Sequence, residues 1–211
     1  MGCRVFLIRH GETQWNKDFR IQGKSDVPLS DNGTRQAEAL SNRLAGQEFA
    51  AFFSSNLSRA RETAAIIARP HNQPVQVLND LQELNFGHWE GMTIEEIRRQ
   101  YRQESSAWWA SPLETRIPGG ENLAELAERS VRAIKTIIER YPRQQVVVVA
   151  HGGTIRSIVG TVLGFDLNQY WRLRQDNASL SIIEFYQWEK GIIMLYNDVS
   201  HLRPGLVPPA D

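Results

Sequence analysis

Two short apolar runs near opposite ends of the chain constrain the fold more than any other feature of the sequence. The first is CRVFLIR at residues 3–9, and the second is QVVVVA at residues 145–150. Neither run alternates between apolar and polar residues, so each predicts a strand that is buried on both faces. Each run is followed at once by a His-Gly pair, His10–Gly11 and His151–Gly152. The two pairs therefore look like two halves of one site.

Between these runs, other apolar segments alternate with segments of helical periodicity. We expect further strands at 49–55 and 75–78, and a hairpin around the EKG sequence at 189–191. Helices are expected after Ser30, over 58–68, from the Thr93–Glu96 capping box to about Gln103, from Leu123 to Pro142, and from Gly153 to Leu163. This alternation predicts an α/β fold with a mostly parallel central sheet, helices on both faces, and an antiparallel edge strand or hairpin near the C-terminus.

One domain is expected to span residues 1–203. Within it, residues 104–120 have no clear period and contain two Pro and two Gly, which predicts an irregular capping excursion over the surface. We expect Trp108 and Trp109 to provide packing for this excursion. Residues 204–211 are rich in proline and are expected to form a flexible tail.

Composition excludes several classes of function. Lys plus Arg equals Asp plus Glu, at 24 each, so no net charge draws the molecule to nucleic acid or to an anionic membrane. Cys3 is the single cysteine, and no HExxH motif or Asp cluster is present, so we expect neither a metal nor another cofactor. The start of the chain lacks the pattern of a signal peptide, which predicts a cytoplasmic protein. The β-rich C-terminal edge could pair two chains as a homodimer.

Chemically active residues follow four of the predicted strands. The carboxyl ends of parallel strands meet at one edge of a sheet, so His10, His151, Arg59 and Glu83 should lie close together. This combination suits a phosphate monoester: arginine binds phosphate oxygens with a planar fork, and the Gly152–Gly153 helix start favours an anion. The sequence therefore predicts a site for a small phosphorylated metabolite.

Six blocks of sequence, in order, resemble the histidine phosphatase superfamily, in its phosphoglycerate-mutase-like branch. They are LIRHGETQWN, LSDNGTRQAEAL, SSNLSRARETA, ELNFGHWEGM, PGGEN and VVVAHGGTIR. The resemblance implies that His10 attacks phosphorus to form a phosphohistidine and that Glu83 is the general acid and base. It also implies that Arg9, Arg59 and His151 bind the phosphoryl oxygens. Residues Asn16, Gln22, Gly23 and Gly152 would then complete the substrate pocket.

Other polar residues near these blocks compete for the same roles. Arg61 is expected at the surface or behind the site, and His88 in an exposed loop. Glu90, Glu95 and Glu96 are alternatives to Glu83, but Glu95 and Glu96 belong to a capped helix. Asn16 could instead cap a turn. His201 is either a contributor to the pocket or a surface residue, and the sequence leaves this open.

The reaction and its substrate stay open among several alternatives. The compact NFGHWEG segment favours a metal-independent phosphatase over a phosphoglycerate mutase. A non-catalytic module that binds phosphorylated ligands is the alternative of another class, but every catalytic position is filled. Phosphoserine is the best candidate substrate, with α-ribazole phosphate, a sugar phosphate, a phosphoglycerate derivative or a broad set of monoesters as alternatives. A phosphoserine carboxylate needs a cation, for which Arg20, Arg116, Arg172 and His201 are candidates.

Overall fold

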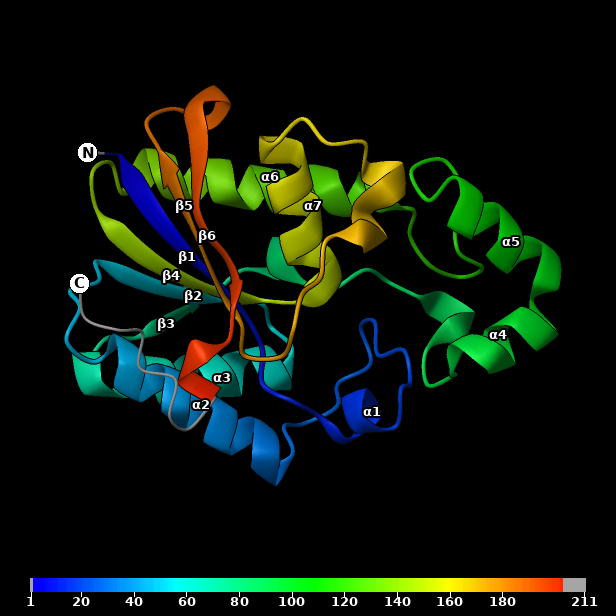
Figure 1. The fold of residues 1–211 in the computed structure, drawn as a ribbon, viewed down its shortest axis with the longest axis horizontal. Helices are drawn as coiled ribbons and strands as arrows, with labels where there is room; N and C mark the ends of the chain where they lie inside the picture. Colours follow the sequence, from blue (N-terminus) through cyan, green and yellow to red (C-terminus); the bar gives the residue numbers. More distant parts are fainter. Residues whose placement is uncertain (1, 203–211) are drawn as a thin grey trace.

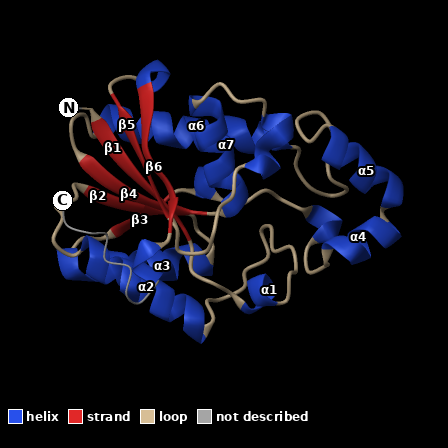
Figure 2. Ribbon diagram, in the orientation of Figure 1, coloured by secondary structure: helices blue, strands red, loops and turns tan. Residues whose placement is uncertain are grey.

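The computed structural model describes residues 2–202, and its centre is a six-stranded mixed sheet (Figure 1; Figure 2). The strands are β1 (Cys3–Arg9), β2 (Ala51–Ser54), β3 (Val75–Val77), β4 (Gln145–Ala150), β5 (Leu180–Phe185) and β6 (Gly191–Asp198). Their order in the sheet is β3-β2-β4-β1-β5-β6. The predicted flexible tail at 204–211 lies outside the described residues.

The first four strands form the parallel part of the sheet. Strand β4 pairs with β1 on one side and β2 on the other, and β3 extends the sheet beyond β2. Strands β1 and β4 are central, which agrees with their unbroken apolar sequences. The mostly parallel α/β architecture predicted from the sequence is therefore confirmed.

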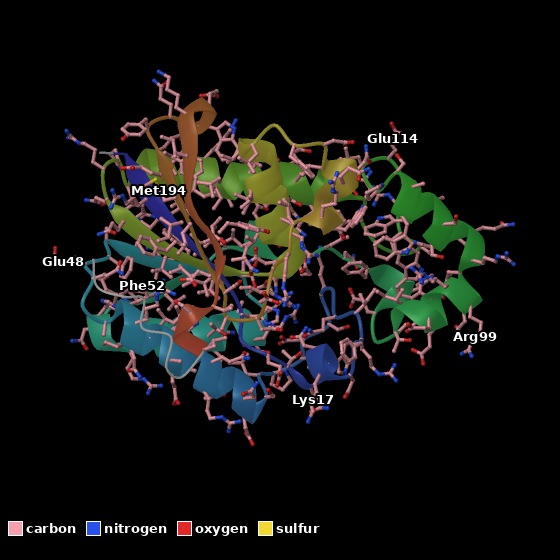
Figure 3. All side chains as sticks on the ribbon, in the orientation of Figure 1. Lys17, Glu48, Phe52, Arg99, Glu114 and Met194 are labelled. Atoms are coloured by element: carbon pink, nitrogen blue, oxygen red, sulfur yellow. The ribbon has the colours of Figure 1, made fainter. Side chains whose placement is uncertain are left out.

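Strands β5 and β6 form an antiparallel hairpin at one edge, as predicted. Strand β5 pairs antiparallel with β1, and β6 pairs with β5 through a register irregularity near Ile182. In β6 partly buried and exposed positions alternate at first, and Ile192 and Met194 are about half exposed. Met194 lies on this edge strand in Figure 3.

Helices cover both faces of the sheet. They are α1 (Gln14–Lys17), α2 (Asp31–Leu44), α3 (Ser58–Ala68), α4 (Ile94–Gln100), α5 (Arg102–Ala110), α6 (Leu123–Arg140) and α7 (Gly152–Val162). Helices α2 and α3 pack on the face that carries Phe6, Ile8 and Phe52. Helices α6 and α7 pack on the opposite face, against Val5 and Leu7. In Figure 3, Phe52 lies between the sheet and the layer of α2 and α3, whereas Lys17 and Arg99 point outward.

Side-chain caps fix where three of these helices begin. Ser30 accepts a hydrogen bond from the Gly33 N–H at the start of α2. Thr93 and Glu96 form the predicted capping box of α4, and Asn122 forms a similar box at the start of α6. Because these caps satisfy N–H groups that have no partner within the helix, local sequence is enough to place the helix starts.

The segment 104–120 differs from the irregular excursion that the sequence predicted. Its first part belongs to α5, which follows α4 after a break at Tyr101, and both helices lie beyond the carboxyl ends of the strands (Figure 1). Trp108 and Ile117 are fully buried in an apolar cluster with Leu84 and Trp89. Burial of the Trp108 and Ile117 side chains thus anchors the segment to the rest of the protein, although its sequence shows only a weak helical pattern. Trp108 thus provides packing, as expected.

Within residues 2–202, none of the helices is both long enough and apolar enough to cross a bilayer.

Candidate active site

The residues that follow the strands gather in one pocket of about 220 Å³ at the carboxyl edge of the sheet. Strands β1, β4 and β2 approach this edge together, and the segment after β3 closes it from the side (Figure 1). The lining residues include most of the predicted set: Arg9, His10, Asn16, Gln22, Gly23, Arg59, Glu83 and Gly152. His151 lies just beneath the lining, with its ring centroid 5.2 Å from that of His10.

His10 is buried and held in one tautomer. Its Nδ1 lies 2.7 Å from the carbonyl oxygen of Gly11, and a carbonyl can only accept, so Nδ1 carries the proton. Nε2 is then left with its lone pair. Burial lowers the pKa of His10 well below its usual value, and the charges of Arg59 and Arg9 lower it further. The ring is therefore neutral and basic only at Nε2 near neutral pH.

Arg9 and Arg59 supply two buried guanidinium groups to the pocket. Backbone carbonyls fix both of them: Arg9 donates to Gln175, and Arg59 donates to Gly23 and Ser25. Burial lowers the pKa of each to about 10, so both stay charged at neutral pH. Each guanidinium has five N–H donors, and the backbone uses only one or two of them. The Nε of each is buried and has no partner among the described residues.

His151 is oriented by Ser55, a residue that the sequence analysis did not identify. The Ser55 hydroxyl lies 2.7 Å from Nε2 of His151, and both side chains are fully buried. The Ser55 oxygen also accepts from the Leu57 N–H at 3.4 Å, which leaves its own proton for His151. Nδ1 of His151 is buried without a partner among residues 2–202. This arrangement favours the tautomer with a proton on Nδ1.

Glu83 faces the start of α7. One carboxylate oxygen accepts from the Gly153 N–H at 3.0 Å, and the other accepts from the N–H of Leu84 at 2.8 Å. A Cβ atom at position 153 would collide with the nearer oxygen, so the glycine is what allows this approach. Glu83 is thereby held at the N-terminal end of α7.

Arg129 on α6 holds the backbone that carries Glu83, a role that no local motif marked. Its guanidinium donates to the carbonyls of Asp80, Gln82 and Glu83 at 2.6–3.0 Å. It also pairs with Glu121, which accepts from the N–H of Asn85. The loop after β3 is therefore tied to α6 on both sides of the glutamate.

Asn16 and Gln22 present amide groups to the pocket. Oδ1 of Asn16 accepts from Thr13 and from Asn177, so the cap that the sequence allowed for Asn16 does form at the start of α1. Oε1 of Gln22 accepts from the Thr13 hydroxyl. Because both amide oxygens are used, the NH₂ groups are the ends left for a ligand. Asn177, which also donates to the carbonyl of His10, was not identified from the sequence.

Glu90 braces the loop that holds Arg59. Its carboxylate accepts from the N–H groups of Lys24, Ser25 and Phe86. Gly23 in this loop has a positive φ of 56°, and a side chain there would collide with the Glu90 carboxylate. Glu90 is therefore a structural partner of the loop and does not line the pocket.

Three residues weighed in the sequence analysis lie away from the pocket. Arg61 and His88 are exposed, on α3 and in the loop after β3, as the sequence predicted. His201 contacts Arg43 and is partly buried, and it does not line the pocket. Among residues 2–202, no group of three or more His, Cys, Asp or Glu side chains is arranged to hold a metal ion.

Comparison with known proteins gives the family. The model of the histidine phosphatase superfamily, branch 1, matches residues 5–198, and the chain belongs to this family of phosphatases and mutases. Phosphoserine phosphatase 1 of Hydrogenobacter thermophilus is 33% identical over 199 residues, with 94% of both chains covered. A probable phosphoglycerate mutase, GpmB, of Serratia proteamaculans is 36% identical over 205 residues, again with 94% of both covered.

A solved structure shares the same fold. It is a histidine-to-alanine mutant of phosphoserine phosphatase from Entamoeba histolytica, in complex with phosphoserine. The TM-score is 0.85 at 27% identity, and the match covers 95% of this chain and 100% of that one. The family resemblance seen in the sequence is therefore confirmed over nearly the whole chain.

Proposed function

We propose that this protein hydrolyses a small phosphomonoester through a phosphohistidine on His10. The observation that carries this proposal is the bond between Nδ1 of His10 and the Gly11 carbonyl. It leaves a neutral Nε2 as the nucleophile beside two fixed guanidinium groups. Nucleophilic attack on phosphorus splits one difficult displacement into two easier ones.

The other pocket residues bind the transferred phosphoryl group. Arg9 and Arg59 neutralise its charge, and Nδ1–H of His151 donates to one oxygen. The NH₂ groups of Asn16 and Gln22, together with the backbone at Gly23 and Gly152, surround the remaining oxygens. Donors that are already fixed by the protein need no reorganisation when charge develops in the transition state.

Glu83 is the general acid and base. Its carboxyl group protonates the leaving oxygen in the first step, and in the second it takes a proton from the water that attacks phosphohistidine. Its position beside the Gly153 N–H, 3.0 Å away, supports this assignment over Glu90, whose oxygens are used by the 24–25 loop. The reaction needs no metal ion, because arginines supply the positive charge.

Phosphoserine is the substrate that we propose first. The pocket of about 220 Å³ is below the 300–1,000 Å³ usual for drug-sized ligands, which favours a compact metabolite over α-ribazole phosphate. Two of the similar proteins described above are phosphoserine phosphatases. Phosphoglycerate mutation is the second candidate, since a relative at 36% identity is a probable phosphoglycerate mutase.

The test of the reaction is release of phosphate, with EDTA present, from phosphoserine, α-ribazole phosphate, 3-phosphoglycerate and several sugar phosphates. Rapid acid-free quenching with labelled substrate should trap a phosphoenzyme in the wild type and in His88→Ala, but not in His10→Ala. Full turnover by His10→Ala would overturn the phosphohistidine route. Interconversion of phosphoglycerates that requires bisphosphoglycerate, without net release of phosphate, would favour the mutase.

Glu83→Gln tests the role of Glu83 as general acid and base independently of the His10 nucleophile. We expect kcat for phosphoserine to fall by about 10²–10⁴-fold while substrate still binds, because the amide cannot transfer a proton. Glu95→Gln is the matched control, since Glu95 is exposed on α4. If Glu83→Gln retained the wild-type kcat, another residue would have to be the general acid.

A further inference from the structure

We infer that Arg156 binds a carboxylate at the non-phosphate end of the substrate, so that the substrates are small phosphomonoesters that carry a carboxylate. This inference rests on the proposed function, because it concerns the same pocket. Arg156 was not among the candidate cations of the sequence analysis. Three observations support the inference: the free donors of its guanidinium, its position beside Tyr170, and the balance of charge in the pocket.

The guanidinium of Arg156 is fixed at the pocket wall. Arg156 lies one helical turn after Gly152 on α7, and both residues line the pocket. Its Nε donates to the carbonyl of Leu173 at 2.6 Å, and its guanidinium carbon lies 5.8 Å from the centre of the Tyr170 ring. Among residues 2–202, neither terminal nitrogen has a hydrogen-bond acceptor. The two outer N–H groups of a planar fork are therefore available to a ligand.

This guanidinium lies on the Tyr170 side of the pocket and is held differently from the other two. Its carbon is 5.8 Å from the centre of the Tyr170 ring, and its Nε bonds to the Leu173 carbonyl. Arg9 and Arg59 are held by the carbonyls of Gln175, Gly23 and Ser25. In the proposed binding mode, the part of the substrate beyond the ester oxygen lies along the Tyr170 side.

The charge balance of the pocket calls for a second anion. Arginines 9, 20, 59 and 156 line it. A phosphate dianion matches the charges of Arg9 and Arg59, and Arg20 is already paired with Glu96 at 3.1 Å. Glu83 also lines the pocket, but as the general acid of the proposed first step it carries a proton and adds no negative charge. Arg156 then keeps an unmatched charge at a partly buried site. A carboxylate fits its fork, since two parallel N–H···O bonds form between these groups.

The other candidate cations are placed too far from the pocket or are already paired. Arg116 pairs with Glu125 and donates to the carbonyl of Gly120, and it does not line the pocket. Arg172 is exposed and is not in the lining. His201 contacts Arg43. Arg20 also lines the pocket, but its charge is matched by Glu96, whereas Arg156 has no carboxylate partner among residues 2–202.

The test compares two substrates that differ by one carboxylate, O-phosphoserine and O-phosphoethanolamine. Both carry a phosphate ester and an ammonium group on the same two-carbon backbone. In the wild type, kcat/KM should favour phosphoserine, and in Arg156→Leu this preference should fall by about 10- to 100-fold, mainly through KM. Arg156→Lys, which keeps a charge but loses the fork, should retain an intermediate preference. Arg98→Leu, at an exposed position on α4, is the control.

Binding to the His10→Ala protein makes the result independent of turnover. Calorimetry with phosphoserine and phosphoethanolamine, with and without Arg156→Leu, should show the same loss of preference. Equal loss for both ligands would overturn the inference, because Arg156 would then act on the phosphoryl group or on the fold. A wild type that hydrolyses both substrates equally well would also overturn it while leaving the phosphatase intact. No turnover of any monoester, with the binding preference present, would overturn the proposed reaction but not the role of Arg156.

Discussion

The guanidinium of Arg129 donates to the main-chain carbonyl of Glu83 at 2.8 Å, and so connects the middle of α6 to the residue proposed as the acid. The same guanidinium bonds to the carbonyls of Asp80 and Gln82, and its charge is matched by Glu121. Three carbonyls of one loop converge on one rigid fork. The segment after β3 contains two single-turn 3-10 helices, Asn79–Leu81 and Gly87–Trp89, and this fork ties the residues between them to α6.

Arg129→Lys should therefore leave Glu83 in place but position its carboxyl group less precisely, and so weaken general-acid catalysis. Lysine keeps the charge beside Glu121 but cannot reach several carbonyls at once, because its three donors share one nitrogen. We expect kcat for phosphoserine to fall by about 10- to 100-fold with KM changed less than about threefold. A substrate with a good leaving group, p-nitrophenyl phosphate, depends less on the acid and should lose less. Arg140→Lys, at an exposed position near the end of α6, is the control. Equal losses for both substrates would contradict a positioning role.

Adjacent glycines at the start of α7 give a matched pair of substitutions. A Cβ at Gly153 would collide with the Glu83 carboxylate, whereas one at Gly152 would meet Arg9 only at an ordinary contact distance of 3.6 Å. Gly153→Ala should lower kcat for phosphoserine by at least about tenfold, and Gly152→Ala should lower it much less. Alanine favours the helix by about 0.5–1 kcal/mol, so Tm should not explain the loss. A similar kcat in both variants would contradict the proposed contact.

Neighbouring serines at the end of β2 test the tautomer of His151. Ser55 bonds to Nε2 of His151, whereas the hydroxyl of Ser54 is buried without a partner among the described residues. Ser55→Ala should lower kcat/KM by about 10- to 100-fold, because Nδ1 can then lose its proton and repel the phosphate. Ser54→Ala should leave the activity intact, because the Ser54 hydroxyl makes no hydrogen bond among the described residues. Nitrogen NMR of His151 should show its proton on Nδ1 in the wild type.

Local patterns in the sequence predict most of the sheet and its helices. Strands β1 and β4 have unbroken apolar segments at residues 5–8 and 146–150, and α2, α4 and α6 carry side-chain caps, so neighbours in sequence determine these elements. Helix α5 was not predicted because residues 104–110 have no clear helical period, and no side-chain cap marks its start. Its stability comes from Trp108, whose ring packs against Trp89 and Tyr170 at centroid distances of 5.9 and 6.1 Å. Contacts so distant in sequence leave no local pattern.

The candidate site divides in the same way. His10 and His151 could be placed together because parallel strands end at one edge of a sheet, and their rings are indeed 5.2 Å apart. The roles of Ser55, Arg129 and Arg156 could not be predicted, because serines and arginines are common in helices and after strands and no motif marks these three. Their importance depends on which acceptor each side chain reaches in three dimensions.

The two buried histidines also predict how stability depends on pH. Burial and the nearby arginine charges lower the pKa of His10 and of His151 well below the usual value of 6.5. As the pH falls below about 6.5, the unfolded chain takes up protons at both residues and the folded chain does not. The free energy of unfolding therefore falls as the pH decreases below about 6.5, by up to about 1.4 kcal/mol per pH unit for each histidine. Above pH 6.5 the stabilisation from the two neutral histidines is fully present.

Urea unfolding between pH 7.5 and 5 measures this slope directly. In a His10→Gln/His151→Gln variant, the free energy of unfolding should fall less steeply below pH 6.5, because glutamine takes up no proton in either state. The pKa of His71 and of His201 is also lowered by burial, so some slope should remain. His88→Gln is the control, since that residue is exposed. The same slope in the double variant and the wild type would mean that the two active-site histidines are protonated in the folded protein, and a protonated His10 could not act as the nucleophile.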